Sequence, residues 1–232
     1  MSTDYAQILK ETVCSDILLF KYWYDFQFNI EQYIPADQMQ SLMCDYPDNV
    51  RTVMLKNPAV RAKFKAAILK ACQLDVELDY DVSSPVLPYA ILSPHTIKRL
   101  IVVLGALVCY SDIAKIIGKS QLDEICGLIG RDVYIFVIKR SLLFWKKIPT
   151  LQEQNHGWKL GQRIQACGKK VFEYVIHGLP DSVIKRLNLR TAMNFNGGTD
   201  VAEQDFTKSL GLAKYAISNF FADDEGAQLC LK

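Results

Sequence analysis

The chain has 232 residues, of which 50% are hydrophobic and 22% are charged, a balance that excludes a disordered chain and provides enough apolar material for a sizeable core. Its longest apolar run, residues 100–110, is about half as long as a bilayer-spanning helix, and residues 1–10 contain no apolar run, so we expect neither a membrane span nor a signal peptide. Seven dispersed cysteines without a CxxC spacing indicate reduced thiols in a cytosolic protein.

The first part of the chain has a mainly helical pattern. Apolar residues recur at helical spacing over 4–20, and the aromatic cluster at 22–28 predicts core packing around a bend. Short helices are expected at 37–46 and 50–55. A firmer helix is predicted to begin at Asn57-Pro58, because Asn is a good N-cap and Pro in the first helical turn loses no needed hydrogen bond.

An acidic segment follows this helix at residues 75–81, where four carboxylates alternate with apolar side chains. A calcium-binding EF-hand loop needs Gly at its sixth position and Glu at its twelfth, but those positions hold Tyr80 and Val86. We therefore predict a solvated acidic connector, with a boundary between about 75 and 92 because prolines continue the linker.

The remainder of the chain is predicted to be helical as well. Ser93-Pro94 begins a helix that is apolar nearly all round, which is typical of the centre of a core. Further helices are expected at 111–117, 120–128, 131–147, 157–176, 180–187 and 206–221, with a turn at 194–199 and a frayed tail after residue 223. The sequence thus predicts an all-α, compact, irregular helical domain of about eight to ten helices with few or no strands. We divide it into an N-terminal helical segment with the acidic connector (1–80), a central helical core (81–195), and a C-terminal helix with its tail (196–232).

No motif for catalysis or cofactor binding is complete. Gly118-Lys119-Ser120 matches the end of a phosphate-binding loop, but Ile113 occupies the position of the required earlier glycine. The three histidines are far apart in sequence and lack metal-ligand spacing. We therefore predict no catalytic residue, no metal, no cofactor and no enzyme activity. A cysteine and histidine brought together in space is the remaining enzymatic alternative.

Charge is segregated along the chain. Residues 1–130 carry 12 Lys and Arg against 15 Asp and Glu, residues 131–190 carry 12 against 4, and residues 191–232 carry 3 against 6. This basic block at 131–190 has three interpretations: pairing inside the protein, docking of an acidic protein, or binding of nucleic acid or anionic lipid. The candidate partner-binding residues from it are Trp145, Lys146, Lys147, Trp158, Lys159, Arg163, Lys170, Lys185 and Arg186.

The central part of the chain resembles a known family. The features are QLDVELDYD, LPYAILSP, the stretch LIVVLGALVCYSDIAKIIGKSQLDEICGLIGRDVYIFVIKRS, and IKRLNLR near residue 190. They are similar to the sorting-platform accessory proteins of type III secretion, the SctK family, over roughly residues 70–195. The resemblance implies a non-enzymatic protein that joins the cytoplasmic domain of the inner-membrane ring protein to the pod built from the cytoplasmic-ring protein.

From the residues and this resemblance together, we predict an adaptor of the type III secretion sorting platform, a virulence apparatus. We expect it at the cytoplasmic face of the bacterial inner membrane, with indirect membrane association only and no nucleic acid bound. The alternative is a helical protein that binds nucleic acid or anionic lipid through the basic block at 131–190.

Overall fold

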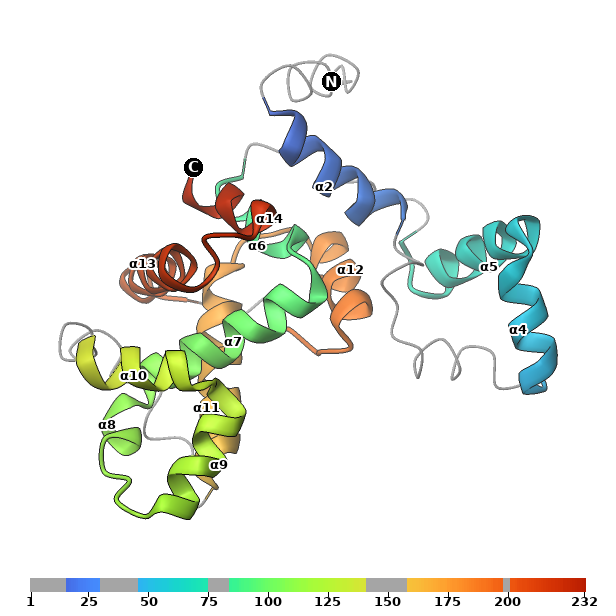
Figure 1. Cartoon of the computed structure of the whole chain (residues 1–232). Coiled ribbons are helices and arrows are strands. Elements are labelled where there is room, and N and C mark those ends of the chain that lie inside the picture. The colour runs from blue at the N-terminus through green and yellow to red at the C-terminus, as the bar shows by residue number, and fades with distance from the viewer. Residues whose placement is uncertain (1–15, 30–45, 75–83, 141–157, 198–200) are drawn as a thin grey trace. The chain divides into compact units, whose positions relative to one another are not determined.

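The computed structural model describes residues 16–29, 46–74, 84–140, 158–197 and 201–232. All the regular structure in these ranges is helical, and nine of their helices have seven or more residues (Figure 1). The all-α prediction is confirmed for the part of the chain that is described.

The chain forms two compact units that are discontinuous in sequence. Unit 1 contains residues 1–94 and 179–195, and unit 2 contains residues 95–178 and 196–232. The sequence analysis divided the chain into contiguous ranges. Contiguous ranges cannot describe units of this kind, because each unit combines two segments that are remote along the chain.

Unit 1 contains five of the described helices. They are α2 (Ile17–Phe28), α4 (Asp48–Lys56), α5 (Pro58–Ala71), α6 (Leu87–Ile91) and α12 (Asp181–Thr191). Helix α4 pairs with α5, and α6 contacts both α2 and α12. The predicted start of α5 is confirmed, since Oδ1 of Asn57 accepts a hydrogen bond of 3.0 Å from the Ala59 N–H.

The aromatic cluster at 22–28 is part of a helix and does not mark a bend as predicted. Helix α2 begins after Asp16, whose carboxylate accepts hydrogen bonds from the backbone N–H groups of Leu18 and Leu19 at 3.2 and 3.1 Å. Trp23 and Phe26, three positions apart, are both buried, as expected for one face of a helix. The helices expected over 4–15 and 37–45 lie outside the described residues.

The predicted linker up to residue 92 is wrong in its second half. Val86 to Leu92 are all buried, and they include helix α6. Pro88 does not interrupt this helix because it occupies the first turn, where its missing N–H is not needed. The segment is therefore part of the core of unit 1, and the acidic residues at 75–81 lie outside the described residues.

Unit 2 is built around α7 (Pro94–Val108), which is buried along most of its length as predicted. The other helices are α8 (Tyr110–Ile113), α9 (Lys119–Ile129), α10 (Arg131–Arg140), α11 (Leu160–Val175), α13 (Glu203–Phe220), α14 (Glu225–Gln228) and the 3-10 helix η5 (Leu229–Leu231). Helices α7 and α11 approach each other closely, since a Cβ atom on Gly105 or Gly168 would overlap the backbone of the opposite helix. Two glycines thus allow backbone-to-backbone packing at the centre of the unit.

The C-terminal tail is packed, which corrects the prediction of a frayed end. Ala227, Leu229 and Cys230 are buried. Asp224 caps α14 by accepting a hydrogen bond of 3.0 Å from the Ala227 N–H, and its second oxygen accepts one of 2.6 Å from the hydroxyl of Thr96 on α7. The tail is ordered because this carboxylate joins it to α7 and its apolar side chains are removed from water.

Candidate protein-binding surfaces

The basic block at 131–190 extends over α10, α11 and α12, so its residues are distributed between the two units. Three of the candidates, Trp145, Lys146 and Lys147, lie outside the described residues. The six others are described, and they have very different surroundings.

Trp158 and Lys159 lie at the beginning of α11, and both are exposed. The indole of Trp158 is 53% exposed, which is unusual for a large aromatic side chain. Lys159 is the N-cap residue, and its backbone N–H donates a hydrogen bond of 3.1 Å to Oε1 of Gln162. The helix start is therefore fixed by Gln162, and the Lys159 ammonium is left at the surface. This pair is a suitable contact point for a protein partner.

Arg163, one turn further along α11, is engaged within unit 2. Its guanidinium lies 2.5 Å from Oδ2 of Asp112 on α8, and the two side chains are 24% and 25% exposed. Lys115 lies 3.7 Å from the other oxygen of the same carboxylate. A charge that is held in this way contributes to packing and offers little to a partner.

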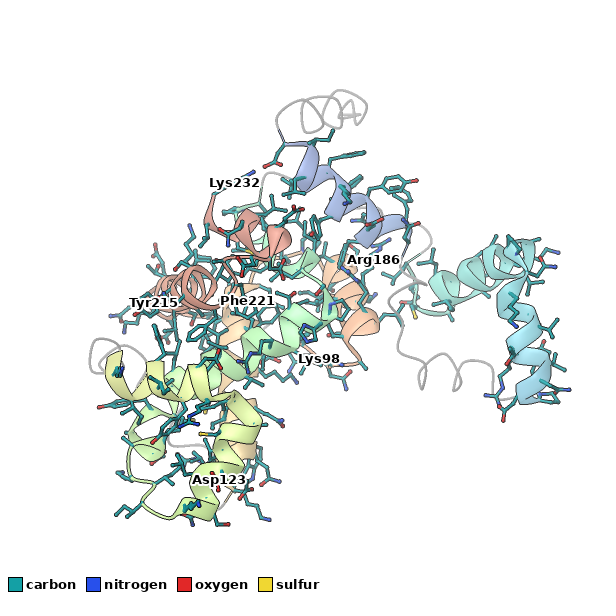
Figure 2. All side chains as sticks on the ribbon, viewed as in Figure 1. Lys98, Asp123, Arg186, Tyr215, Phe221 and Lys232 are labelled. Carbon is teal, nitrogen blue, oxygen red and sulfur yellow. The ribbon has the colours of Figure 1, made fainter. Side chains whose placement is uncertain are left out.

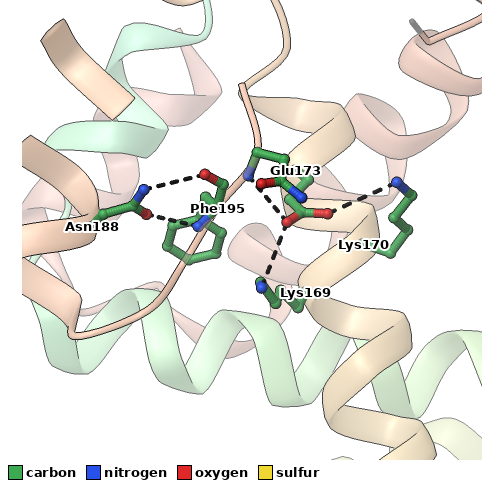
Figure 3. A network of polar contacts seen from close by, with 6 residues as sticks. Lys169, Lys170, Glu173, Asn188 and Phe195 are labelled. Carbon is green, nitrogen blue, oxygen red and sulfur yellow. Dashed lines mark hydrogen bonds and ion pairs between the residues drawn. The ribbon is translucent and has the colours of Figure 1, made fainter. Parts of the chain in front are cut away.

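Lys170 is also engaged within unit 2 (Figure 3). Its ammonium lies 3.9 Å from Oε2 of Glu173 and 5.1 Å from the centre of the Tyr174 ring. Lys169 lies 3.7 Å from the other oxygen of Glu173, which also accepts a hydrogen bond of 3.2 Å from the backbone N–H of Asn196. Two lysines of the basic block thus neutralise a carboxylate that is only 5% exposed.

The two neighbours on α12, Lys185 and Arg186, have opposite environments. Lys185 is exposed, whereas Arg186 is 1% exposed. Figure 2 labels Arg186 on α12. The Arg186 guanidinium donates hydrogen bonds to the carbonyl oxygens of Leu74 at 3.0 Å and Ser182 at 3.4 Å. Arg186 therefore cannot form part of an exposed docking surface in this structure, which corrects its selection from the sequence.

Sequence reasoning missed this burial, although a signal for it was present. Arg186 and Arg190 are four positions apart and share a helix face with Val183 and Leu187, both buried. Arg190 is 3% exposed, with its guanidinium 5.1 Å from the centre of the Phe26 ring. An arginine that falls on the apolar face of a helix is a candidate for internal hydrogen bonding before it is a candidate for a partner.

The enzymatic alternative gains no support from the buried thiols. Cys109, which directly follows α7, and Cys167 on α11 are both buried. A hydrogen bond with the Cys167 thiol and then burial raise the pKa of Cys109 above its ordinary value. Burial likewise raises the pKa of Cys230. Thiols held in the protonated form are poor nucleophiles.

Histidine and metal chemistry give no further site among the described residues. His95 is exposed on α7, and His177 follows the end of α11. Within the ranges that the structure covers, no three side chains of His, Cys, Asp or Glu gather closely enough to hold a metal ion. None of the helices in those ranges combines the length and the apolar character that crossing a bilayer requires.

One exposed apolar residue was not anticipated. Ile117 was predicted to lie in a helix over 111–117, but α8 ends at Ile113 and Ile117 is 97% exposed in the loop before α9. Lys115 and Lys119 flank it along the chain and are also exposed. The two lysines on either side of the apolar residues in this loop are visible in the sequence, but the end of the helix is not.

Comparison with protein families identifies the chain. Residues 22–216 match the model of a family described as YOP proteins translocation protein K, YscK. The match begins within α2 and continues through most of α13, so it covers the described helices of both units up to that point. The chain belongs to the YscK family.

This result confirms the resemblance to the SctK family that the sequence indicated. As a YscK-family member, the chain is a type III secretion component, and the family is not a known enzyme family. The exposed residues Trp158, Lys159 and Lys185 all fall within the matched range. No curated protein and no solved structure gave a significant match.

Proposed function

We propose that this YscK-family protein is a non-enzymatic adaptor of the type III secretion sorting platform. It bridges the cytoplasmic domain of the inner-membrane ring protein to the pod of the cytoplasmic-ring protein. Its place is the cytoplasmic face of the inner membrane. The membership of the secretion family supports this role.

One observation carries the bridging part of the proposal. The candidate cations that stay exposed after internal pairing lie on both units: Lys159 beside Trp158 on unit 2, and Lys185 on unit 1. Each unit has a buried core of its own, so each can present a separate surface. We assign one partner to each surface.

Two surfaces on one chain need only modest individual affinities. When one partner is bound, binding of the second becomes an intramolecular event with a high effective concentration. Exposed lysines contribute to such contacts mainly by steering the encounter and selecting acidic partners. Trp158 adds an aromatic anchor of the kind that dominates interface energetics.

The test measures the binding of each partner separately, using purified full-length chain and either the ring protein's cytoplasmic domain or the pod protein. The unit 2 variant combines Trp158→Ala with Lys159→Glu, and the unit 1 variant is Lys185→Glu. Each is expected to weaken the binding of one partner at least about tenfold, by losing a hot-spot contact or reversing a charge, and to retain the other. Lys214→Glu on unit 2 and Lys21→Glu on unit 1 are matched controls, since both lysines are exposed.

Three results would contradict the proposal. The first is full binding of both partners by both variants, and the second is equal losses in the controls. The third is retention of nucleic acid that declines steeply with salt at physiological ionic strength and is lost with Lys159→Glu and Lys185→Glu. That last result would favour the alternative function, in which the basic block at 131–190 binds nucleic acid.

A further inference from the structure

The densest positive charge on an exposed element lies outside the basic block at 131–190. Residues 48–71, which form α4 and α5, contain one acidic residue and six basic ones, a net charge of +5. The charge sums of the sequence analysis concealed this feature, because residues 1–130 were summed together. Acidic residues on either side of the helix pair gave that range a net negative charge.

Few of the described side chains of α4 and α5 belong to the core of unit 1. Of their described side chains, Ile68 alone is buried. The Leu74 residue that follows α5 is 1% exposed, and its carbonyl accepts the hydrogen bond from Arg186 on α12. The pair is thus anchored at its C-terminal end, and most of its described side chains are exposed to solvent.

Three lysines of this helix pair are exposed at its surface. Lys56, Lys63 and Lys70 are exposed, and Lys63 and Lys70 are two turns apart on one face of α5. Among the described residues of the pair, Arg51 forms an ion pair of 2.6 Å with Asp48 on the same helix. This contrasts with α11, where Arg163 and Lys170 are paired with carboxylates inside unit 2.

Apolar side chains accompany this charge. Val50 and Val53, one turn apart on α4, are 38% and 68% exposed. A basic helix that also presents aliphatic side chains has the two components of binding to a lipid surface: attraction to anionic headgroups and insertion of apolar groups at their level.

We propose that the α4–α5 helix pair binds the surface of an anionic lipid bilayer. An acidic protein is the competing occupant, but lysine is depleted from the cores of protein interfaces. Among the described side chains of this pair, the exposed basic ones are the lysines Lys56, Lys63 and Lys70. Lysine-rich segments with a few apolar residues are typical of attachment to anionic membranes, where each basic residue near the surface adds attraction. This contact goes beyond the proposed function, because it attaches the chain directly to the membrane and not solely through its protein partners.

The experiment measures sedimentation of the full-length protein with vesicles of phosphatidylcholine alone or mixed with phosphatidylglycerol, over a salt series. The wild-type chain is expected to bind the anionic vesicles and not the neutral ones, and to dissociate as salt rises. The variant Lys56→Glu, Lys63→Glu, Lys70→Glu should lower the partition coefficient at least about 100-fold. Val50→Ser with Val53→Ser should weaken binding less and leave its salt dependence unchanged.

The matched control is Lys119→Glu, Lys139→Glu, Lys214→Glu, which changes the net charge equally at exposed positions of unit 2 and should retain binding. An equal loss of vesicle binding in this control would overturn the proposal, because it would show that binding depends on the net charge of the protein and not on the α4–α5 helix pair. Equal binding to neutral vesicles would also overturn it. Binding of polyglutamate that requires the same lysines, without vesicle binding, would identify an acidic protein as the occupant. Partner binding is measured separately, so failure here leaves the adaptor proposal standing.

Discussion

Arg163 on α11 and Asp112 on α8 form an ion pair whose closest atoms are 2.5 Å apart. The two residues are 51 positions apart in the chain, and about three quarters of each side chain is shielded from water. Each charge loses part of its hydration on folding, and the attraction between the two charges compensates for that loss.

We expect Arg163→Ala to lower the free energy of unfolding by about 1–2 kcal/mol, since a charge-assisted hydrogen bond is lost and Asp112 remains partly desolvated. Urea unfolding measures this change. A double-mutant cycle with Asp112→Ala should give a coupling energy of at least about 0.5 kcal/mol. Additive single effects would mean that the two side chains act independently.

The crossing of α7 and α11 leads to a second prediction. A methyl group on Gly105 would overlap the Ile164 carbonyl, and one on Gly168 would overlap the Ile101 carbonyl. Because backbone atoms cannot yield as a flexible side chain does, Gly105→Ala and Gly168→Ala should each lower the free energy of unfolding by about 3 kcal/mol or more.

Gly127 on α9 provides the matched control for these two changes. A Cβ atom there meets nothing within 4 Å, so Gly127→Ala should raise the stability by about 0.5–1 kcal/mol through the lower entropy of the unfolded chain. Thermal unfolding distinguishes the two classes by the direction of the shift in Tm. A small effect at Gly105 would show that the helices separate at little cost.

Local patterns were sufficient to predict most helices. Asn57-Pro58 marks the start of α5 because capping depends on adjacent residues. The inward face of α11, with Ile164, Cys167 and Val171 buried, follows from a spacing of three and four residues. Features of this kind are encoded within a few turns of the chain, so they can be read without knowledge of the tertiary structure.

Features that depend on remote contacts were not predictable. The tail is ordered by Asp224 and Thr96, which are 128 residues apart, and Arg186 is buried by contact with Leu74, 112 residues away. A charge count along the chain locates the basic block at 131–190. It does not show that cations of this block are paired inside the protein, or that Lys56, Lys63 and Lys70 on α4 and α5 are exposed. Burial and pairing are properties of the folded arrangement.

The contrast between Lys185 and Arg186 gives the third prediction. Arg186→Ala should lower the free energy of unfolding by about 2–4 kcal/mol, because the Leu74 carbonyl loses its donor and a buried side chain is removed. Lys185→Ala should change it by less than about 0.5 kcal/mol, since that side chain is exposed. Denaturant unfolding of both variants provides the comparison. If Arg186→Ala weakened partner binding with unchanged stability, the arginine would be a docking residue after all.

The fourth prediction concerns the buried thiols and alkaline pH. Burial raises the pKa of Cys230 above its ordinary value, and the Cys167 hydrogen bond and burial raise that of Cys109. The folded chain therefore keeps these protons at pH values where the unfolded chain releases them. The stabilisation is fully present below about pH 8.5, the ordinary pKa of a free thiol, and declines as the pH rises beyond it.

Each such thiol should contribute a decline of about 1.4 kcal/mol per pH unit in the free energy of unfolding above that point. Urea unfolding in the presence of reductant at pH 7, 8, 9 and 10 measures this slope. Cys230→Ala should reduce this slope by the contribution of one thiol, about 1.4 kcal/mol per pH unit. Leu229→Ala, at the adjacent buried position, should lower the stability equally at every pH and leave the slope as in the wild type, because it removes apolar contacts and no titrating group. An unchanged slope in Cys230→Ala would show that the thiol ionises as readily in the folded chain as in the unfolded one.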